Sequence, residues 1–116
     1  MPNYNGYNRL ETPAAELVQE RYGSELYEYY PLGQYIVAAP GVCGGRPTFK
    51  YTRLEATMIL ARLSRGETVE ELLQAYAASK LNAEAIYEAI YLASQALLQV
   101  TLPLRRTKAH LEVVSA

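Results

Sequence analysis

The segment from Pro40 to Arg53 constrains the fold more than any other part of the chain. It reads Pro-Gly-Val-Cys-Gly-Gly-Arg-Pro-Thr-Phe-Lys-Tyr-Thr-Arg and contains three glycines and two prolines. Glycine permits backbone conformations with positive φ, whereas proline fixes φ and has no backbone N–H to donate. This density of both residues predicts a tight turn whose path is set by the backbone rather than by a packed side chain.

Length and composition predict a single domain with a hydrophobic core. The chain has 116 residues, 50% of them hydrophobic, and a formal net charge of −1, so it lacks the basic footprint of sequence-independent nucleic-acid binding. One cysteine, Cys43, excludes an internal disulfide and fits a reducing compartment. No apolar run reaches the roughly 20 residues of a membrane helix, and the N-terminus lacks the pattern of a signal peptide. We therefore expect a cytoplasmic protein without a membrane partner.

Capping residues and apolar periodicity predict four helices. Thr12, followed by proline, has the residue type that starts a helix, and Gly23 has the type that ends one. Thr68 and Glu71 form a capping-box pattern, and Asn82 is a further N-cap. Apolar residues recur at three- and four-residue spacing between these signals. The expected helices span 13–22, 54–65, 69–76 and 82–98.

Two short strands are predicted on either side of the glycine-rich turn, at 35–37 and 48–50. Pro31 and Gly33 interrupt the tyrosine-rich segment before them, so any strand there must be split. Two strands of this length are marginal on their own. They require a helix beneath them or strands from a second copy of the chain, which is a first indication of a dimer.

The predicted helix over 82–98 is apolar on two faces. One stripe is expected to form the core: Ile86, Ala89, Ile90, Ala93 and Leu97. A second stripe lies beside it: Tyr87, Tyr91, Ser94 and Leu98. A helix with two apolar faces usually packs against two neighbours.

Tyrosine is the dominant aromatic residue, with 11 copies against one phenylalanine and no tryptophan. Its ring is buried while its hydroxyl keeps a polar contact, a combination favoured at interfaces. We therefore expect a dimer interface rich in tyrosine. The candidate residues are Tyr27, Tyr29, Tyr30, Tyr35, Tyr87 and Tyr91.

Three helices joined by two short connections have the layout of a helix-turn-helix unit, with the helix over 82–98 as its recognition helix. That helix has two acids, Glu84 and Glu88, and neither lysine nor arginine, whereas a recognition helix normally offers donors to bases and phosphates. Packing is therefore the better account of it. If DNA is bound, the positive surface would come from Arg46, Lys50, Arg53, Arg62 and Arg65. A solvated face is the favoured alternative for these five, and Arg53 has the further alternative of locking the turn to the helix.

The sequence contains no recognisable catalytic or metal-binding constellation. Cys43 has no partner cysteine, and the single histidine, His110, is distant in the chain, so no base is apparent for a thiol nucleophile. A small buried thiol in a tight turn is the better interpretation. The Gly44–Arg46 run lacks the spacing of a phosphate-binding loop. We expect a non-enzyme without cofactor or metal.

The run from Pro40 to Pro47, the Thr52-Arg53 pair and the Glu-Glu-Leu-Leu sequence at 70–73 resemble the small bacterial family known as domain of unknown function 433. The resemblance spans about residues 36–93. It implies a homeodomain-like three-helix bundle preceded by a short strand region. Some members are similar to antitoxins paired with PIN-type toxin ribonucleases, which implies binding of DNA and of a toxin. The chain resembles the cyanobacterial stand-alone branch, and it has Tyr51 where the family commonly has glycine.

These patterns predict a mainly α fold, a homeodomain-like, helix-turn-helix-like three-helix bundle preceded by an N-terminal helix and short β-strands. The expected parts are an N-terminal arm with a short helix (1–35), a strand-turn and three-helix domain (36–98) and a C-terminal tail (99–116). Two functions remain open. One is a small dimeric DNA-associated or antitoxin-like regulator, with DNA or a PIN-type toxin as partner. The other is a dimeric protein–protein interaction module without DNA binding.

Overall fold

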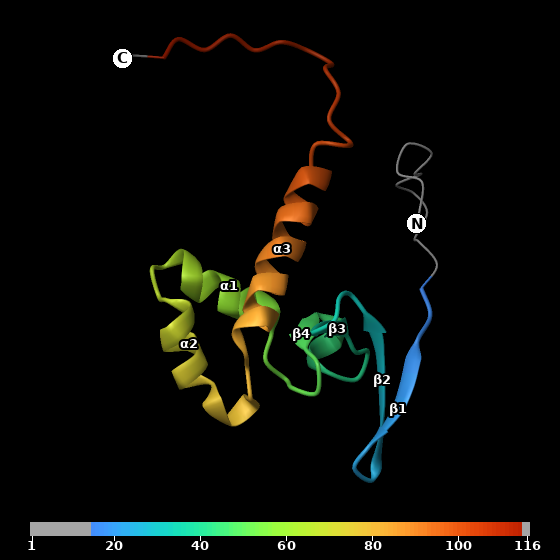
Figure 1. Cartoon of the computed structure of the whole chain (residues 1–116). Helices are drawn as coiled ribbons and strands as arrows, with labels where there is room; N and C mark the ends of the chain where they lie inside the picture. The colour runs from blue at the N-terminus through green and yellow to red at the C-terminus, as the bar shows by residue number, and fades with distance from the viewer. Residues whose placement is uncertain (1–14, 115–116) are drawn as a thin grey trace.

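The computed structural model describes residues 15–114, which form a sheet beside three helices (Figure 1). The strands are β1 (Val18–Tyr22), β2 (Glu25–Pro31), β3 (Ile36–Ala38) and β4 (Pro47–Phe49). The helices are α1 (Ala56–Ser64), α2 (Val69–Ala75) and α3 (Ala83–Gln99), and short 3₁₀ turns lie at Cys43–Gly45 and Ala77–Ser79. The sheet contacts the helices through β4 on α1 and β3 on α3.

The four strands form one antiparallel sheet in the order β1-β2-β3-β4. The expected mainly α fold is therefore wrong, because sheet and helices contribute together to the architecture. The strands predicted at 35–37 and 48–50 are confirmed, with a shift of one residue each, as β3 and β4. They pair with each other, so that Val37 lies opposite Thr48.

The N-terminal helix expected over 13–22 is wrong in the described part of the chain, where Val18–Tyr22 is strand β1; Thr12 and Pro13 lie outside the described residues. Gly23 does not end a helix. With Ser24 it makes a two-residue hairpin turn in which Gly23 has a φ of 67° and Tyr22 pairs with Glu25, as a type II′ turn requires of its first central residue. The apolar spacing fitted a helix, but cross-strand pairing with β2 determines the conformation.

The remaining helix predictions are confirmed, including their caps. Thr68 Oγ1 accepts a hydrogen bond from the Glu71 backbone at 3.1 Å, and the Glu71 carboxylate accepts one from the Thr68 backbone at 2.8 Å. Asn82 Oδ1 accepts from the Ala85 backbone at 2.8 Å. Each cap satisfies backbone donors that the first turn of a helix leaves without an intrahelical partner.

The glycine-rich segment forms the tight turn that its composition predicts. Cys43, Gly44 and Gly45 have φ values of 49°, 65° and 84°, a left-handed run that two glycines make accessible. The half-buried Cys43 thiol donates to the Arg53 carbonyl at 3.4 Å. The turn is thereby connected to the segment that leads into α1.

The main core lies between the helices and the inner strands. Ile59, Leu72 and Ile86, one from each helix, are fully buried, and Ile36 and Phe49 from the sheet complete the centre of the cluster. A second, smaller cluster is formed by Tyr29, Val37 and Ala39 on the other side of the sheet. Thr48 lies buried within β4, and its hydroxyl has no hydrogen-bond partner among the described residues.

The carboxylate of Glu88 fastens α3 to the sheet. It accepts three backbone hydrogen bonds from the end of the β2–β3 loop and the start of β3: from Gln34 at 2.8 Å, from Tyr35 at 2.7 Å and from Ile36, the first residue of β3, at 3.0 Å. Gly33 makes this approach possible, because a Cβ atom there would lie 2.5 Å from the Glu88 carboxyl carbon. We call this contact the Glu88 latch.

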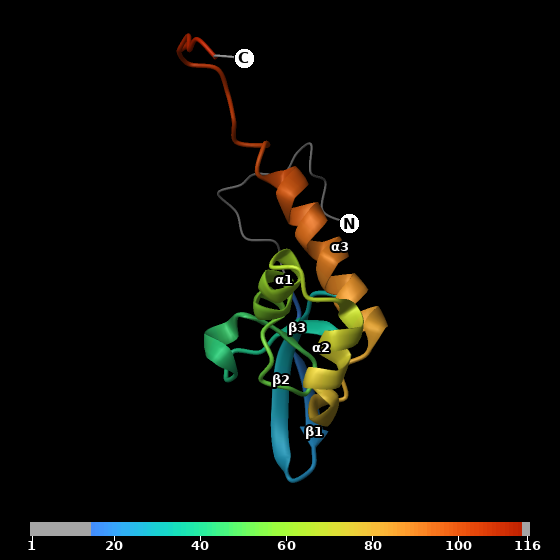
Figure 2. The ribbon, with the colours of Figure 1, turned by 90° about the vertical axis from the view of Figure 1, so that its left-hand side faces the viewer.

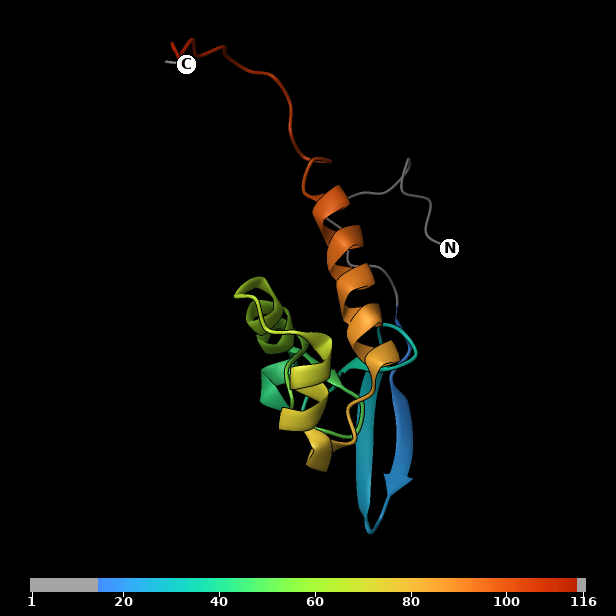
Figure 3. The same ribbon diagram turned by 60° about the vertical axis from the view of Figure 1, so that its left-hand side comes forward.

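The second half of α3 extends beyond the rest of the structure. Figures 2 and 3 show its C-terminal turns rising clear of α1, α2 and the sheet, followed by a tail without helix or strand. Only the N-terminal half of the helix contributes buried residues, namely Ala85, Ile86 and Ala89.

We predict that Glu88→Ala lowers the free energy of unfolding by about 2 kcal/mol, because three backbone donors lose a charged acceptor. Gly33→Ala should have a similar effect. The double variant should lose less free energy of unfolding than the two single variants lose together, because both changes break the same contact. Urea denaturation measures all three. Glu70→Ala, at an exposed acid in the first turn of α2, is the control, and an equal loss there would contradict the latch.

We also predict that Thr48→Val raises the free energy of unfolding by about 1 kcal/mol, because it removes a buried hydroxyl without a partner and keeps the side-chain shape. Thr52→Val is the matched control. The Thr52 hydroxyl donates to the Phe49 carbonyl at 2.7 Å and accepts from the Leu54 backbone at 3.0 Å, so this variant should be destabilised. Thermal unfolding of the two variants side by side decides the point.

Candidate interaction surface

One side of α3, from Tyr87 in its first half to Leu98 in its second, presents a continuous apolar surface. Tyr87, Tyr91, Leu97 and Leu98 are 57%, 60%, 68% and 67% exposed. The predicted core stripe is therefore right for Ile86 and Ala89 and wrong, within this chain, for Ile90, Ala93 and Leu97, which are exposed. The physical reason is that, of the α3 residues after Ala89, only Leu92 packs against the core formed by the described residues, where it is partly buried.

This surface also carries no charge. Between Glu88 and Arg105 the sequence has no acidic or basic residue, and the side chains at both ends of this interval differ in sign. Isolated exposed apolar residues are ordinary on protein surfaces, but a contiguous apolar face on one helix is a candidate for an interaction site. We call Tyr87, Ile90, Tyr91, Leu97 and Leu98 the α3 face.

The six tyrosines predicted at an interface fall into two groups. Tyr27, Tyr29, Tyr30 and Tyr35 are half-buried or buried within the chain, with Tyr29 only 4% exposed. Tyr87 and Tyr91 lie on the α3 face. Of the six predicted tyrosines, only Tyr87 and Tyr91 therefore lie together on an exposed surface.

The five basic residues predicted as a positive surface are divided among different surroundings. Arg46 pairs with Glu55 through two hydrogen bonds of 2.8 and 3.1 Å. Arg62 pairs with Glu67 and donates to the Tyr76 hydroxyl, both at 2.6 Å. Lys50 lies 3.8 Å from a carboxylate of β1. The ion pairs of the described residues do not include Arg53 or Arg65.

These pairs change the titration of their acids. Hydrogen bonding from Arg46 lowers the pKa of Glu55, and hydrogen bonding from Arg62 lowers the pKa of Glu67. The guanidinium groups are correspondingly held in their charged form, with the pKa of Arg46 and of Arg62 raised mainly by the same hydrogen bonds. Both arginines are used within the chain, which reduces the positive surface available to a polyanion.

A cluster of tyrosines joins the β1–β2 hairpin to the segment after β4. Tyr51 stacks on Tyr22 with a centroid distance of 4.6 Å and an interplanar angle of 7°, and its backbone N–H donates to the Tyr27 hydroxyl at 3.1 Å. Tyr51 has a φ of 67°, which is costly for a bulky residue and requires support from its neighbours. We call these contacts, together with Glu20 and Lys50, the hairpin clamp.

Glu20 is the polar centre of the hairpin clamp. Its carboxylate accepts hydrogen bonds from the Tyr51 hydroxyl at 2.6 Å and from the Tyr29 hydroxyl at 2.7 Å. Lys50 Nζ lies 4.8 Å from the ring centroid of Tyr29 and 5.1 Å from that of Tyr51, within range of cation–π attraction. The hydrogen bond from Tyr51, then that from Tyr29, and then the charge of Lys50 lower the pKa of Glu20.

Sequence reasoning missed the hairpin clamp. The signals that could have found it are the Gly23-Ser24 hairpin turn and the alternation of Val18, Glu20 and Tyr22 on one strand face. The stacking of Tyr22 on Tyr51 could not be foreseen, because it joins residues on separate elements.

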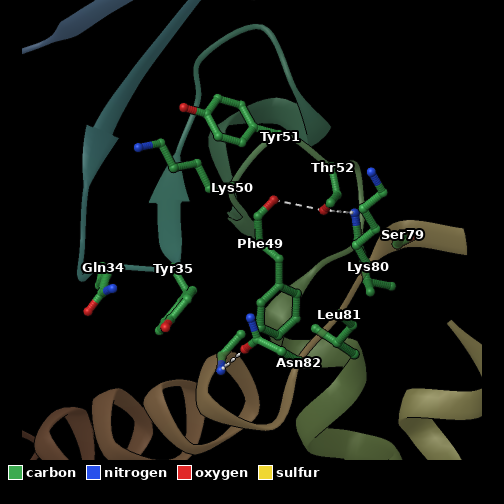
Figure 4. A pocket seen from close by; sticks show the side chains of 12 residues that line it. Gln34, Tyr35, Phe49, Lys50, Tyr51, Thr52, Ser79, Lys80, Leu81 and Asn82 are labelled. Carbon is green, nitrogen blue, oxygen red and sulfur yellow. Dashed lines mark hydrogen bonds between the residues drawn. The ribbon is translucent and has the colours of Figure 1, made fainter. Parts of the chain in front are cut away.

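A groove lies between the β4–α1 loop and the α2–α3 loop (Figure 4). In that view Gln34 and Tyr35 border one side, Lys50 to Thr52 another, and Ser79 to Asn82 a third, with the Phe49 ring between them. The groove has a volume of about 380 Å³ in this region.

No group of three or more histidine, cysteine, aspartate or glutamate side chains within residues 15–114 is arranged to hold a metal ion. No helix in the same residues is long and apolar enough to cross a membrane.

The fold and these surfaces define a small α+β domain with an accessory N-terminal hairpin. A family model described as "Protein of unknown function (DUF433)" matches residues 36–93, from β3 into α3. The chain belongs to this family, as the Pro40–Pro47 run and the Glu-Glu-Leu-Leu helix suggested. The β1–β2 hairpin lies before the matched region. No match is found for the chain among curated proteins or solved structures.

We predict that Glu20→Gln reduces the dependence of stability on acid pH. The pKa of Glu20 is lowered from its ordinary value of 4.5 in the folded state, so the unfolded state takes up a proton first as pH falls. The resulting stabilisation is complete above pH 4.5 and is lost as pH falls through the lower, folded pKa. Urea denaturation at several pH values between about 3 and 6 gives the free energy of unfolding at each pH. This free energy should fall less steeply with falling pH for the variant than for the wild type.

Glu25→Gln makes the same charge change at the turn of the same hairpin and is the control. Near-UV circular dichroism, which reports on tyrosine packing, should follow the acid-induced loss in the wild type. Identical slopes for the wild type and Glu20→Gln would show that the hairpin clamp does not depend on the carboxylate.

Proposed function

We propose that this protein is a dimeric protein–protein interaction module that assembles with a second copy through the α3 face and does not use its three-helix unit to bind DNA. The observation that carries the proposal is the exposed apolar side of α3 from Tyr87 to Leu98, which continues through the uncharged second half of the helix. A helix with a wide apolar stripe in water requires a partner to bury it. The rest of α3 is already fixed to the sheet by the Glu88 latch, so the exposed half is presented on a rigid base.

A second copy fits this surface because of its charges and its spacing. Tyr87, Tyr91, Ser94 and Leu98 are separated by four, three and four residues, the spacing of a seam between two helices. The exposed Glu84 lies in the first turn of α3, and Arg105 and Arg106 follow its C-terminal end. An antiparallel arrangement brings the acidic end of one copy to the basic end of the other and also aligns the helix dipoles favourably.

DNA binding by the predicted set has less support. Arg46 and Arg62 are engaged by carboxylates and Lys50 belongs to the hairpin clamp. The first turn of α3 carries Glu84, and Glu88 is occupied by the loop before β3. A recognition helix with these residues would offer acceptors where phosphates require donors.

We predict a mass by light scattering near twice the 13.0 kDa of one chain. Leu98→Glu and Tyr91→Glu should each reduce it to the mass of a single chain at micromolar concentration, because a carboxylate cannot be buried in an apolar interface without a partner. Leu111→Glu is the matched control, since Leu111 is 91% exposed in the tail. A monomeric wild type, or a dimer unaffected by both α3 variants, would overturn the proposal.

Charge reversal tests the antiparallel arrangement. Glu84→Lys alone should weaken the dimer, and combining it with Arg105→Glu and Arg106→Glu should restore it, because the opposite charges are exchanged.

A gel shift titrated against salt tests the alternative function, which is DNA binding. A steep salt dependence would favour a DNA-associated regulator, whereas the absence of a shift at low ionic strength agrees with the interaction module.

A further inference from the structure

The groove continues past Tyr51 into a region of about 460 Å³ that the hairpin helps to line. One wall is the segment from Lys50 to Arg53, and the opposite wall is the segment from Ala78 to Lys80. Tyr22 borders the same space from the end of β1. The two parts of the groove share Lys50, Tyr51, Thr52, Ser79 and Lys80 as lining residues.

The lining is basic. Lys50, Arg53 and Lys80 border this part of the groove, and no acidic side chain is among the residues that line it. Lys50 forms an ion pair with Glu20, with 3.8 Å between Lys50 Nζ and Glu20 Oε2. The ion pairs found within residues 15–114 do not involve Arg53 or Lys80. The N-cap of α3, Asn82, borders the adjoining part, where the helix dipole adds positive potential.

Both walls contain backbone that costs free energy. Tyr51 and Lys80 have φ values of 67° and 55°, and neither is a glycine. Such residues persist only where the surroundings enforce them, and they are concentrated at binding sites. Tyr51 and Lys80 lie on opposite walls of the same groove. Their constrained backbone therefore also restricts where the nearby Arg53 and Ser79 lie.

The aromatic pair gives the groove a second kind of contact. Tyr22 and Tyr51 are stacked, and the two residues are 55% and 41% exposed, respectively. A planar ring can stack on such a surface, while guanidinium and ammonium groups bind phosphate. The volume lies in the range of small-molecule sites.

We propose that this groove binds a nucleotide, with its phosphate on Arg53 and Lys80 and its base against the Tyr22–Tyr51 pair. The site combines residues of the family core with a residue of the hairpin. It is distinct from the α3 face, so nucleotide binding and self-association are separate properties of the chain.

The experiment measures binding of adenosine monophosphate to the full chain by calorimetry and by amide chemical shifts. Arg53→Gln and Lys80→Asn should each weaken binding by at least about tenfold, since each removes a charged contact to phosphate. Asparagine is chosen at position 80 because it tolerates the left-handed conformation. Arg65→Gln, which removes a positive charge at the end of α1, should leave binding unchanged.

Further probes separate the two contacts. Adenosine should bind much more weakly than its monophosphate. Tyr22→Leu should weaken binding of the monophosphate and leave binding of inorganic pyrophosphate unchanged. The Leu98→Glu variant should retain the site, so a failed dimer and a failed nucleotide site are distinguishable. The proposal is overturned by no binding of the monophosphate at millimolar concentration, by equal binding of adenosine, or by binding that survives both basic substitutions. Binding of single-stranded oligonucleotide alone would also overturn it.

Discussion

The carboxylate of Glu88 is the contact on which the relation between sheet and helices depends. Two backbone N–H groups of the loop before β3 and that of the first residue of β3 converge on it, so the start of β3 and the first half of α3 are held together by charge-assisted hydrogen bonds. Gly33 is required because no side chain fits between the loop and the carboxylate. The apolar core of Ile36, Ile59 and Ile86 then packs around a geometry that this polar contact has fixed.

The hairpin is attached by a different principle. Its strand pairing with β3 is short, with Tyr30 opposite Ala38 and Pro31 opposite Val37. Most of its fixation comes from side chains, through the stack of Tyr22 on Tyr51 and the hydroxyls that converge on Glu20. The left-handed backbone at Tyr51 is the cost of placing that ring against the hairpin. An element outside the family core is thus fastened at one strained position inside it.

Local signals predicted local structure well. The caps at Thr68 and Asn82, the stripe of Ile86 and Ala89 and the turn at Cys43–Gly45 each depend on neighbouring residues, and the structure confirms them. The main error arose where strand pairing overrides a helical pattern. Val18 to Tyr22 has helical apolar spacing, but it pairs with β2 across the Gly23-Ser24 turn, and that turn was the local signal for a hairpin. The part that Glu88 plays in fastening α3 to the sheet was also missed, because its partners lie more than 50 residues away in the sequence. The groove could not be predicted, because its walls are separated in sequence and meet only through the packing of α2 and α3.

The extension of α3 beyond Ala89 also bears on how its shape is maintained. A short helical stretch without tertiary contacts is marginal in water, and the turns after Leu92, up to Gln99, have only their connection to the packed part of the helix as a template. Pairing with another copy would supply the missing contacts, so coil-to-helix ordering of these turns and association would be one coupled equilibrium. The helical content of the chain should then rise with protein concentration, and the length of α3 would be a property of the assembly rather than of the single chain.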